Sequence, residues 1–374
     1  MNAAVASAPS PVATAAAAAS PSARIALLGT GTVGRAVLAR LAAWEAAPDA
    51  APPASLSLVH VANSRTGFRP DSAAGAGVRA ARTVAAGAAP SLDELPSRLG
   101  EDGVRIVLDA TASDAVAERH AEWLARGLHV VTACKLGQGT SLARWRAIGR
   151  AQSAGATRYG DSATVGAGLP VLHAIRALRA GGDRIHAVAG VLSGSLAWLF
   201  HHYDGLRPFS GFVRQAREAG YTEPDPREDL SGEDVRRKLL ILARSAGVAL
   251  EAEAVAVDSL VPPALAALAP DAVDAALAQL DAPLRERYAA AYKRGEKLRF
   301  IARLEDGRAR VGLEALAADH PLAGGAGTDN RVAIWSDRYR AQPLVIQGPG
   351  AGAEVTAAAM LDDALAIVAG ARRG

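Results

Sequence analysis

The side chains best suited to chemistry gather in one short segment near the middle of the chain. This segment, Gly220–Lys238, contains six carboxylates and ends on three basic residues. The carboxylates are Glu223, Asp225, Glu228, Asp229, Glu233 and Asp234, and the basic residues at the end are Arg236, Arg237 and Lys238. Carboxylates can hold an ammonium group by charge-assisted hydrogen bonds, and a lysine in a partly dry cleft can transfer a proton. The composition therefore fits a pocket for a small zwitterion.

The same segment also has a purely structural interpretation. Its two prolines disfavour helix in the residues before them, so its first half should be extended. A helix is then expected over 231–246, with Ser231 as N-cap and Asp234 at the third helical position. Asp234 and Lys238 are four residues apart and share one helix face. Taken alone, the segment fits a capping box with an ion pair better than it fits a pocket.

A glycine fingerprint near the start indicates a second site. Residues 24–28 have the apolar pattern of a strand, and residues 35–41 have the pattern of a helix. Between them, Gly29 permits a tight turn, Gly31 lets a pyrophosphate approach the backbone, and Gly34 allows helix and strand to pack closely. The fingerprint predicts a dinucleotide site that consists of Gly29, Thr30, Gly31, Thr32, Val33 and Gly34.

The next strand should position the residues that distinguish NAD from NADP. Residues 56–62 form an apolar strand pattern that ends at Asn63-Ser64-Arg65. An NAD enzyme usually places an acid here for the ribose 2′-hydroxyl, whereas this chain has Arg65. We therefore expect Asn63 and Arg65 to contact the cofactor and NADP to be preferred, with NAD as the second option. In the alternative interpretation Arg65 only points to solvent.

Two further strands should bring polar residues to the same crevice. Residues 104–109 and 128–132 are apolar, and the helix expected between them, 114–126, has Ser113 as its N-cap. Ligands of open α/β sheets bind at the carboxyl ends of the strands. The residues expected along this rim are Thr111, Ser113, Thr132, Cys134 and Lys135. Of these, we expect Thr111, Ser113 and Lys135 to contact the cofactor.

Length and composition narrow the class of protein. A chain of 374 residues favours two domains, and a net charge of +3 without a Lys/Arg run argues against a nucleic-acid partner. No apolar run is long enough to span a membrane, and a lone cysteine fits a reducing compartment. We expect an α/β cytoplasmic protein that binds a small molecule. Its expected parts are an Ala/Pro/Ser tail (1–23), a Rossmann-like doubly wound nucleotide-binding domain (24–160), an α+β domain (161–347) and a C-terminal segment returning to the nucleotide domain (348–374).

Six motifs, in the same order as in the family, resemble homoserine dehydrogenase. They are Gly29–Gly34, Thr164–Pro170, Gly190–Ser195, Gly220–Arg227, Leu230–Lys238 and Gly348–Ala357. The resemblance implies NAD(P)-dependent interconversion of L-homoserine and L-aspartate 4-semialdehyde, in threonine and methionine biosynthesis. It also implies a homodimer and makes 161–347 the catalytic and dimerisation domain. Because no aspartokinase region is recognised in the sequence, we expect a monofunctional form.

The resemblance also assigns roles to residues. Glu223, Asp229, Asp234 and Lys238 match the family's substrate-binding and proton-transfer residues, and Lys135 matches a lysine at the nicotinamide. We favour Lys238 as proton donor, because its helix also carries Asp234, and expect Lys135 to polarise the carbonyl. Gly350 lies in a late glycine-rich loop that should return to the cofactor.

Two positions depart from the family pattern. The family binds a monovalent cation such as Na+ through the backbone of the positions matched by Val165, Ala167 and Leu169. The family's acidic ligand falls at Ser162 here, with Asp161 beside it as a replacement. At the second position Cys134 replaces an asparagine, and a thiol is a poor substitute for the hydrogen bonds of an amide.

These departures leave two alternative functions. In the first, Cys134 is a thiol nucleophile, as in the phosphorylating semialdehyde dehydrogenases, and Lys135 lowers its pKa. No motif places a histidine as its base. In the second, the chain is a non-catalytic NADP-binding sensor that has kept the fold and lost turnover. The complete set of carboxylates and lysines argues against this second alternative.

Overall fold

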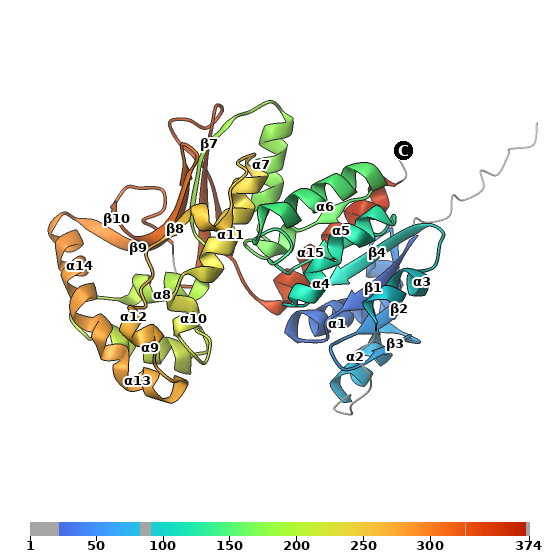
Figure 1. Ribbon diagram of the computed structural model, residues 1–374, viewed down its shortest axis with the longest axis horizontal. Helices are drawn as coiled ribbons and strands as arrows, with labels where there is room; N and C mark the ends of the chain where they lie inside the picture. The colour runs from blue at the N-terminus through green and yellow to red at the C-terminus, as the bar shows by residue number, and fades with distance from the viewer. Residues whose placement is uncertain (1–21, 83–90, 326, 372–374) are drawn as a thin grey trace, which may run out of the picture.

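The computed structural model describes residues 22–82, 91–325 and 327–371. Within them, two six-stranded sheets form separate halves that lie side by side (Figure 1). The first sheet has the order β3-β2-β1-β4-β5-β6, and the second has the order β12-β11-β7-β9-β10-β8. The predicted α/β architecture, with a nucleotide-binding half and a second half of mixed structure, is confirmed.

The first sheet is parallel except for its edge strand β3, and helices cover both of its faces. Its strands are β1 (Ser22–Leu28), β2 (Ser55–Ala62), β3 (Gly67–Phe68), β4 (Val104–Asp109), β5 (His129–Thr132) and β6 (Tyr159–Gly160). Alternate residues of β1 enter opposite cores. Ile25 and Leu27 pack towards α1 (Thr32–Ala46), α2 (Ala73–Arg82) and α15 (Ala353–Gly370). Ala26 and Leu28 pack towards α3 (Leu95–Leu99), α4 (Asp114–Glu118), α5 (His120–Ala125) and α6 (Leu142–Gly155).

The second sheet is mostly antiparallel and has its largest core on one face. Its strands are β7 (Ile185–Val191), β8 (Val255–Val257), β9 (Glu296–Glu305), β10 (Arg308–Ala317), β11 (Asp329–Ser336) and β12 (Leu344–Pro349). The helices of this half are α7 (Val171–Ala180), α8 (Gly194–His202), α9 (Phe209–Glu218), α10 (Arg227–Leu230), α11 (Glu233–Ser245), α12 (Pro263–Ala266), α13 (Val273–Ala276) and α14 (Asp281–Lys293). Helix α11 lies where this half meets the first (Figure 1).

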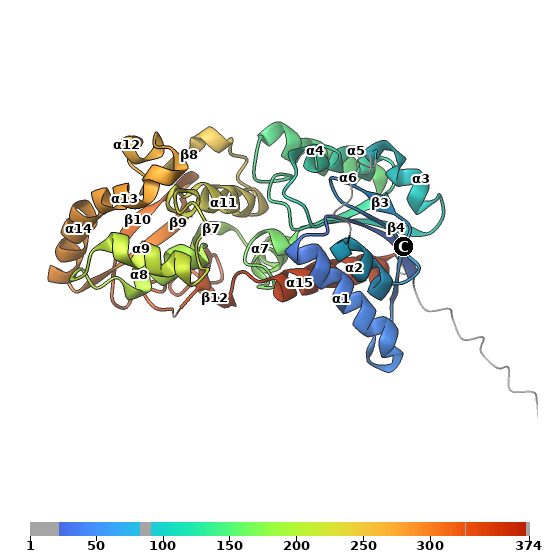
Figure 2. The ribbon, with the colours of Figure 1, turned by 90° about the horizontal axis from the view of Figure 1, so that it is seen from below.

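The last helix returns to the first half. After β12 the chain crosses over, and α15 packs beside α1 against the first sheet (Figure 2). Within the described residues, no helix is both long and apolar enough to cross a membrane. The expected tail 1–23 lies almost entirely outside the described residues, and the predicted domain limits stay predictions.

Two helix boundaries differ from the prediction. The helix predicted at 231–246 begins at Glu233, because Gly232 adopts a left-handed φ of 78° and separates it from α10. Ser231 is therefore the C-cap of α10; its hydroxyl donates to the Glu228 carbonyl at 2.8 Å. The helix predicted at 114–126 is two helices, α4 and α5. Its predicted cap is confirmed, since the Ser113 hydroxyl accepts a hydrogen bond from the Val116 amide.

Candidate active site

The carboxyl ends of β1, β2 and β4 enclose a cavity of about 700 Å³. The three fingerprint glycines line it or pack beneath it. A Cβ on Gly29 would stand 2.6 Å from the Ala110 carbonyl oxygen, and a Cβ on Gly34 would stand 1.9 Å from the Gly29 carbonyl oxygen. A Cβ on Gly31 would meet no atom within 4 Å, so the backbone there is open to a ligand. The glycines therefore have the separate roles that a dinucleotide fingerprint requires.

The helix that follows the fingerprint presents a free N-terminus to this cavity. Helix α1 starts at Thr32 with Gly31 as its N-cap, no side chain caps it, and its first turn has no acidic residue. Its uncapped backbone N–H groups and its dipole favour an anionic group such as a pyrophosphate. Thr32, Val33 and Gly34 form its first turn. The residues present thus fit a dinucleotide.

The end of β2 contributes the other side of the cavity. The Asn63 amide nitrogen donates to the Thr30 hydroxyl at 2.9 Å, and its oxygen accepts from the Arg65 and Thr66 backbone amides. Arg65 is exposed and lines the cavity, and no acid stands among the cavity's described lining residues. The Asn63 side chain therefore stabilises the turn that follows β2, whereas the Arg65 guanidinium is available to an anionic ligand.

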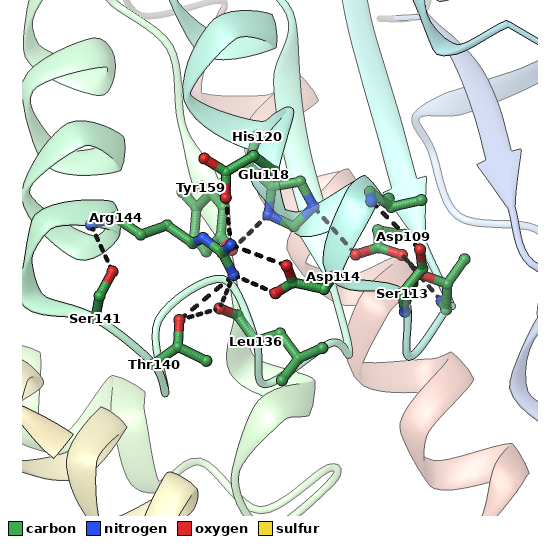
Figure 3. A network of polar contacts seen from close by, with 12 residues as sticks. Asp109, Ser113, Asp114, Glu118, His120, Leu136, Thr140, Ser141, Arg144 and Tyr159 are labelled. Carbon is green, nitrogen blue, oxygen red and sulfur yellow. Dashed lines mark hydrogen bonds and ion pairs between the residues drawn. The ribbon is translucent and has the colours of Figure 1, made fainter. Parts of the chain in front are cut away.

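A buried polar network adjoins Thr111, which lines the third side of the cavity. Figure 3 shows three of its members, Asp109, His120 and Tyr159. Asp109, which is fully buried at the end of β4, accepts hydrogen bonds from Thr111, from the Thr132 hydroxyl at 2.9 Å and from His120 Nε2 at 3.0 Å. The other nitrogen of His120 is 2.9 Å from the Tyr159 hydroxyl. The network fixes Thr111 and the start of the loop that carries Lys135. Sequence analysis did not identify Asp109, His120 or Tyr159 as part of the site. Asp109 could have been found, because an acidic residue at the end of a buried strand is unusual.

The two predicted lysines meet across the junction of the halves, although they are far apart in the sequence. Lys135 follows β5, whereas Asp234 and Lys238 lie on α11. The Asp234 carboxylate is 3.3 Å from the Lys135 ammonium and 2.8 Å from the Lys238 ammonium. Lys238 also donates to the Leu192 carbonyl at 2.8 Å. The i,i+4 ion pair expected from the sequence is present, and Lys135 extends it to a triad.

The charges within this triad oppose the effects of burial. Desolvation alone would raise the pKa of the Asp234 carboxyl, but the two ammonium groups, Lys238 before Lys135, hold that pKa at about 2. Desolvation lowers the pKa of Lys238, which the charge of Asp234 counteracts only in part. A lysine whose pKa is lowered by burial can donate and accept a proton more readily than an exposed lysine.

The carboxylates before α11 lie close to this triad. Asp229 accepts a hydrogen bond from the Ser195 hydroxyl at 2.6 Å and another from the Glu223 backbone amide at 2.8 Å. Ser195 is itself 2.8 Å from the Ser193 hydroxyl, so the residues after β7 fix the orientation of Asp229. The Glu223 side chain is exposed and has no hydrogen bond within the described chain. Asp225, by contrast, is paired with Arg227 at 2.6 Å.

Cys134 is packed inside the protein and is not open to a substrate. Its side chain is 3% exposed, and its backbone amide donates to the Thr132 hydroxyl at 2.8 Å. Desolvation, aided by the charge of Asp109, raises the pKa of its thiol to about 11. At neutral pH the thiolate needed by a nucleophile is therefore scarce.

The segment expected to hold a cation fits only in part. Val165 and Ala167 have backbone carbonyls without backbone partners in the described chain, and Ala167 has a left-handed φ of 50°. Asp161, the replacement acid, forms a bidentate pair with Arg176 at 2.6 Å for both contacts. Ser162 donates to Asp363. The Val165 and Ala167 carbonyls suit a hard cation. The predicted Leu169 carbonyl, however, already accepts a hydrogen bond from the Val171 amide at 2.8 Å, and the expected carboxylate is engaged.

Gly350 lies away from the described cavity lining. A Cβ there would stand 1.7 Å from the Asn330 side-chain oxygen, so the glycine allows the chain to pass over β11 before α15 begins. Its contact with a cofactor stays a prediction.

A doubly wound nucleotide-binding half joined to a lysine-carboxylate triad defines a dinucleotide-dependent oxidoreductase. Comparison with known proteins gives the family. Residues 29–159 match the family model described as homoserine dehydrogenase, NAD binding domain, and residues 170–365 match the model described as homoserine dehydrogenase. The chain belongs to the homoserine dehydrogenase family and has its NAD(P)-binding domain.

Individual relatives agree with this family. The chain is 34% identical to a homoserine dehydrogenase of Emericella nidulans, with 91% of this chain and 97% of that protein covered. It is 45% identical to a bifunctional aspartokinase/homoserine dehydrogenase of Escherichia coli over 69% of this chain, and spans about a third (32%) of that protein's length. A crystal structure of a Candida auris protein of unknown function is similar, with a TM-score of 0.84 and 34% identity over 94% of this chain and 99% of that chain.

Proposed function

We propose that this protein interconverts L-homoserine and L-aspartate 4-semialdehyde with NADP(H). The observation that carries the proposal is the triad of Lys135, Asp234 and Lys238, which joins the rim of the nucleotide-binding half to α11 of the other half. An aldehyde or alcohol carbon placed there would lie between the cofactor-binding half and two proton-bearing side chains. Family membership supports the same reaction.

The bound cofactor would supply or accept the hydride at the substrate carbon. During reduction, Lys238 donates a proton to the developing alkoxide, and during oxidation it takes the proton back. Lys135 is the more exposed lysine, with 32% of its side chain accessible against 12% for Lys238, and polarises the carbonyl oxygen. Asp234 holds both lysine side chains in position.

The substrate's own ammonium group binds the carboxylates that precede α11. Asp229 is oriented by Ser195, and each of its oxygens can accept a further hydrogen bond. Glu223 presents a carboxylate without an internal partner in the described chain. These two residues would distinguish an amino-acid substrate from a simple aldehyde.

Preference for NADP is supported by Arg65. Its exposed guanidinium lines the dinucleotide cavity at the position where an acid would bind the 2′-hydroxyl of NAD. A 2′-phosphate would form charge-assisted hydrogen bonds with it. Thr111 and Ser113 line the same cavity and complete the contacts that we propose for the cofactor.

Four further assignments rest mainly on the family. We propose that the product enters threonine and methionine biosynthesis in the cytoplasm. A homodimer formed through the second half is supported by the edge strand β12. Leu344, Val345 and Ile346 of this strand are partly exposed, and β11 is its one partner among the described strands. A monovalent cation held by the backbone of Val165, Ala167 and Leu169 is proposed as a weak site, because Asp161 is engaged by Arg176.

The direct test is oxidation of homoserine, measured by absorbance of the reduced cofactor with NAD and NADP in parallel. We expect activity with both and a higher kcat/KM with NADP, and Arg65→Ala should remove the preference. Cofactor binding without homoserine-dependent reduction would favour the sensor instead. A Cys134→Ser variant should retain most activity, because the buried Cys134 thiol is not open to a substrate. Complete loss of activity would support the alternative in which Cys134 is the nucleophile.

A further inference from the structure

A second large cavity is lined by residues of α6, α7, α11 and α15. These four helices lie where the two halves meet (Figures 1 and 2). Its volume is about 660 Å³, close to that of the dinucleotide cavity, and it shares no lining residue with that cavity. Six arginines line it, namely Arg146, Arg150, Arg158, Arg176, Arg179 and Arg244. The proposed reaction uses none of them.

Most of this positive charge has no counter-charge in the described chain. Arg176 is the exception, because it pairs with Asp161. The remaining arginines form no ion pair with any residue that the structure describes; they are Arg146, Arg150, Arg158, Arg179 and Arg244. Asp363 is the one carboxylate among the described lining residues, and it already accepts two hydrogen bonds from Ser162. The cavity therefore has an excess of positive charge.

Arg244 gives a second, independent indication of an anionic ligand. It is only 2% exposed, and its terminal nitrogens donate to the backbone carbonyls of Gln138, Thr140 and Leu250. Its Nε has no partner within the described chain. Desolvation lowers the pKa of Arg244 to about 10, despite the charge of Glu251. A buried cation without a carboxylate partner is costly, and a nearby anion would offset that cost.

The wall formed by α6 leaves room for such a ligand. A Cβ on Gly149 would meet no atom within 4 Å, and Trp145 lines the cavity with its ring centre 5.9 Å from the Arg244 guanidinium carbon. Arg146 and Arg150 are exposed on the same helix, one turn apart. Guanidinium groups bind phosphate and carboxylate in bidentate geometry, and the volume is within the range of small-molecule sites.

We propose that this cavity binds a small polyanion that carries at least two negative charges as phosphate or carboxylate groups. Because α6 belongs to the nucleotide-binding half and α11 carries Asp234 and Lys238, the bound polyanion contacts both halves at once. The site is therefore positioned to affect the proposed reaction without touching the substrate.

The test is calorimetric titration of the full chain with pyrophosphate and, separately, with citrate, while saturating NADP+ occupies the dinucleotide cavity. We expect saturable binding that also changes the intrinsic tryptophan fluorescence, because Trp145 lines the cavity. The double variant Arg146→Gln/Arg150→Gln should weaken it by about tenfold or more and leave the dissociation constant of NADP+ unchanged. Both arginines are exposed and unpaired in the described chain, so folding should be preserved. Arg285→Gln, at an exposed arginine of α14, is the matched control.

Each outcome has a defined meaning. Binding of pyrophosphate alone supports a phosphoryl ligand, and binding of both probes supports a polyanion site of broader specificity. The proposal is overturned if acetate at equal ionic strength produces the same signal, or if the double variant binds both probes as the wild type does. Because the measurement follows binding and not turnover, its result is independent of whether homoserine is the substrate.

Discussion

At the scale of single residues, Lys238 and Lys135 share one carboxylate but differ in their surroundings. Lys238 is the more buried of the two and is anchored to the Leu192 carbonyl. We expect Lys238→Ala to reduce kcat/KM for homoserine by about 10²- to 10⁴-fold, because general acid–base catalysis contributes an effect of that size. The dissociation constant of NADP+ should not change, since Lys238 does not line the dinucleotide cavity. Steady-state kinetics and a binding titration measure the two quantities.

The neighbouring Arg237→Ala variant is the control for the loss of a positive charge on α11. It should keep nearly all of the activity. If Lys238→Ala also retained its turnover, the proton-donor role would pass to Lys135.

The pH dependence of homoserine oxidation should report the charge of Asp234. In the proposed mechanism oxidation needs Lys238 in its neutral form, so the rate should rise as pH increases through the Lys238 pKa. Desolvation lowers this pKa, and the negative charge of Asp234 raises it again. Asp234→Asn removes that charge, so the pKa should fall further and the profile of kcat/KM should move to lower pH. Profiles normalised to their own maxima are compared.

Glu233→Gln is the matched control, because Glu233 lies in the same first turn of α11 but pairs with Arg236. Its profile should coincide with that of the wild type. A profile for Asp234→Asn that is unchanged, or moved to higher pH, would show that Lys238 is not the group that titrates.

The sequence predicted which residues form the site more completely than it predicted the contacts between them. The spacing of Asp234 and Lys238 determined their ion pair, because a helix brings residues four apart to one face. No local rule could place Lys135 on the same carboxylate, since that contact depends on how the halves pack. His120 of α5 was also unpredictable, because its role depends on contacts with Asp109 of β4 and Tyr159 of β6.

At the scale of elements, substitution by alanine should have different effects at Gly31 and Gly34 of the dinucleotide fingerprint. Gly34→Ala places a Cβ 1.9 Å from the Gly29 carbonyl oxygen, which cannot be accommodated without moving helix or strand. We expect a loss of about 1–3 kcal/mol in stability, although alanine usually stabilises a helix. Gly31→Ala meets no atom within 4 Å and should fold normally while binding NADP+ more weakly, because its Cβ fills the open cavity. Thermal unfolding and NADP+ titration measure both.

The two variants serve as controls for each other. Equal losses of stability would contradict the separate roles of the glycines. Unchanged NADP+ affinity in Gly31→Ala would mean that the pyrophosphate does not approach this part of the backbone.

The elements of the nucleotide-binding half were easier to predict than those of the second half. Buried parallel strands form continuous apolar runs between glycine-marked turns, as in β1 and β4. Strand β11 was not predicted, because it follows a stretch rich in Gly and Ala and does not alternate apolar and polar residues. Strand β12 was not predicted either; its apolar run, 344–346, is only three residues long. The start of α11 was misplaced because Ser231 matches a capping box, whereas the left-handed backbone at Gly232 delays the helix by two residues.

At the scale of the whole molecule, helix α15, which lies late in the chain, packs against elements that lie early in it. The helix follows the last strand of the second sheet but packs into the core of the first sheet beside α1 (Figure 2). Ser162, near the junction, donates to Asp363 on the same helix. The nucleotide-binding half therefore includes the last helix as a structural part of its core, and its stability should depend on residues far from the fingerprint.

Met360 tests this dependence most directly. Its side chain is fully buried in the core that contains Leu27 of β1 and Val37 of α1. Met360→Ala should reduce the free energy of unfolding by about 2–5 kcal/mol, because it removes buried surface and leaves a cavity. Asp362→Ala, at an exposed position of the same helix, should change it by less than about 0.5 kcal/mol. Urea unfolding with and without NADP+ measures both variants. A small effect at Met360 would show that α15 is an attachment to the nucleotide-binding half and not part of its core.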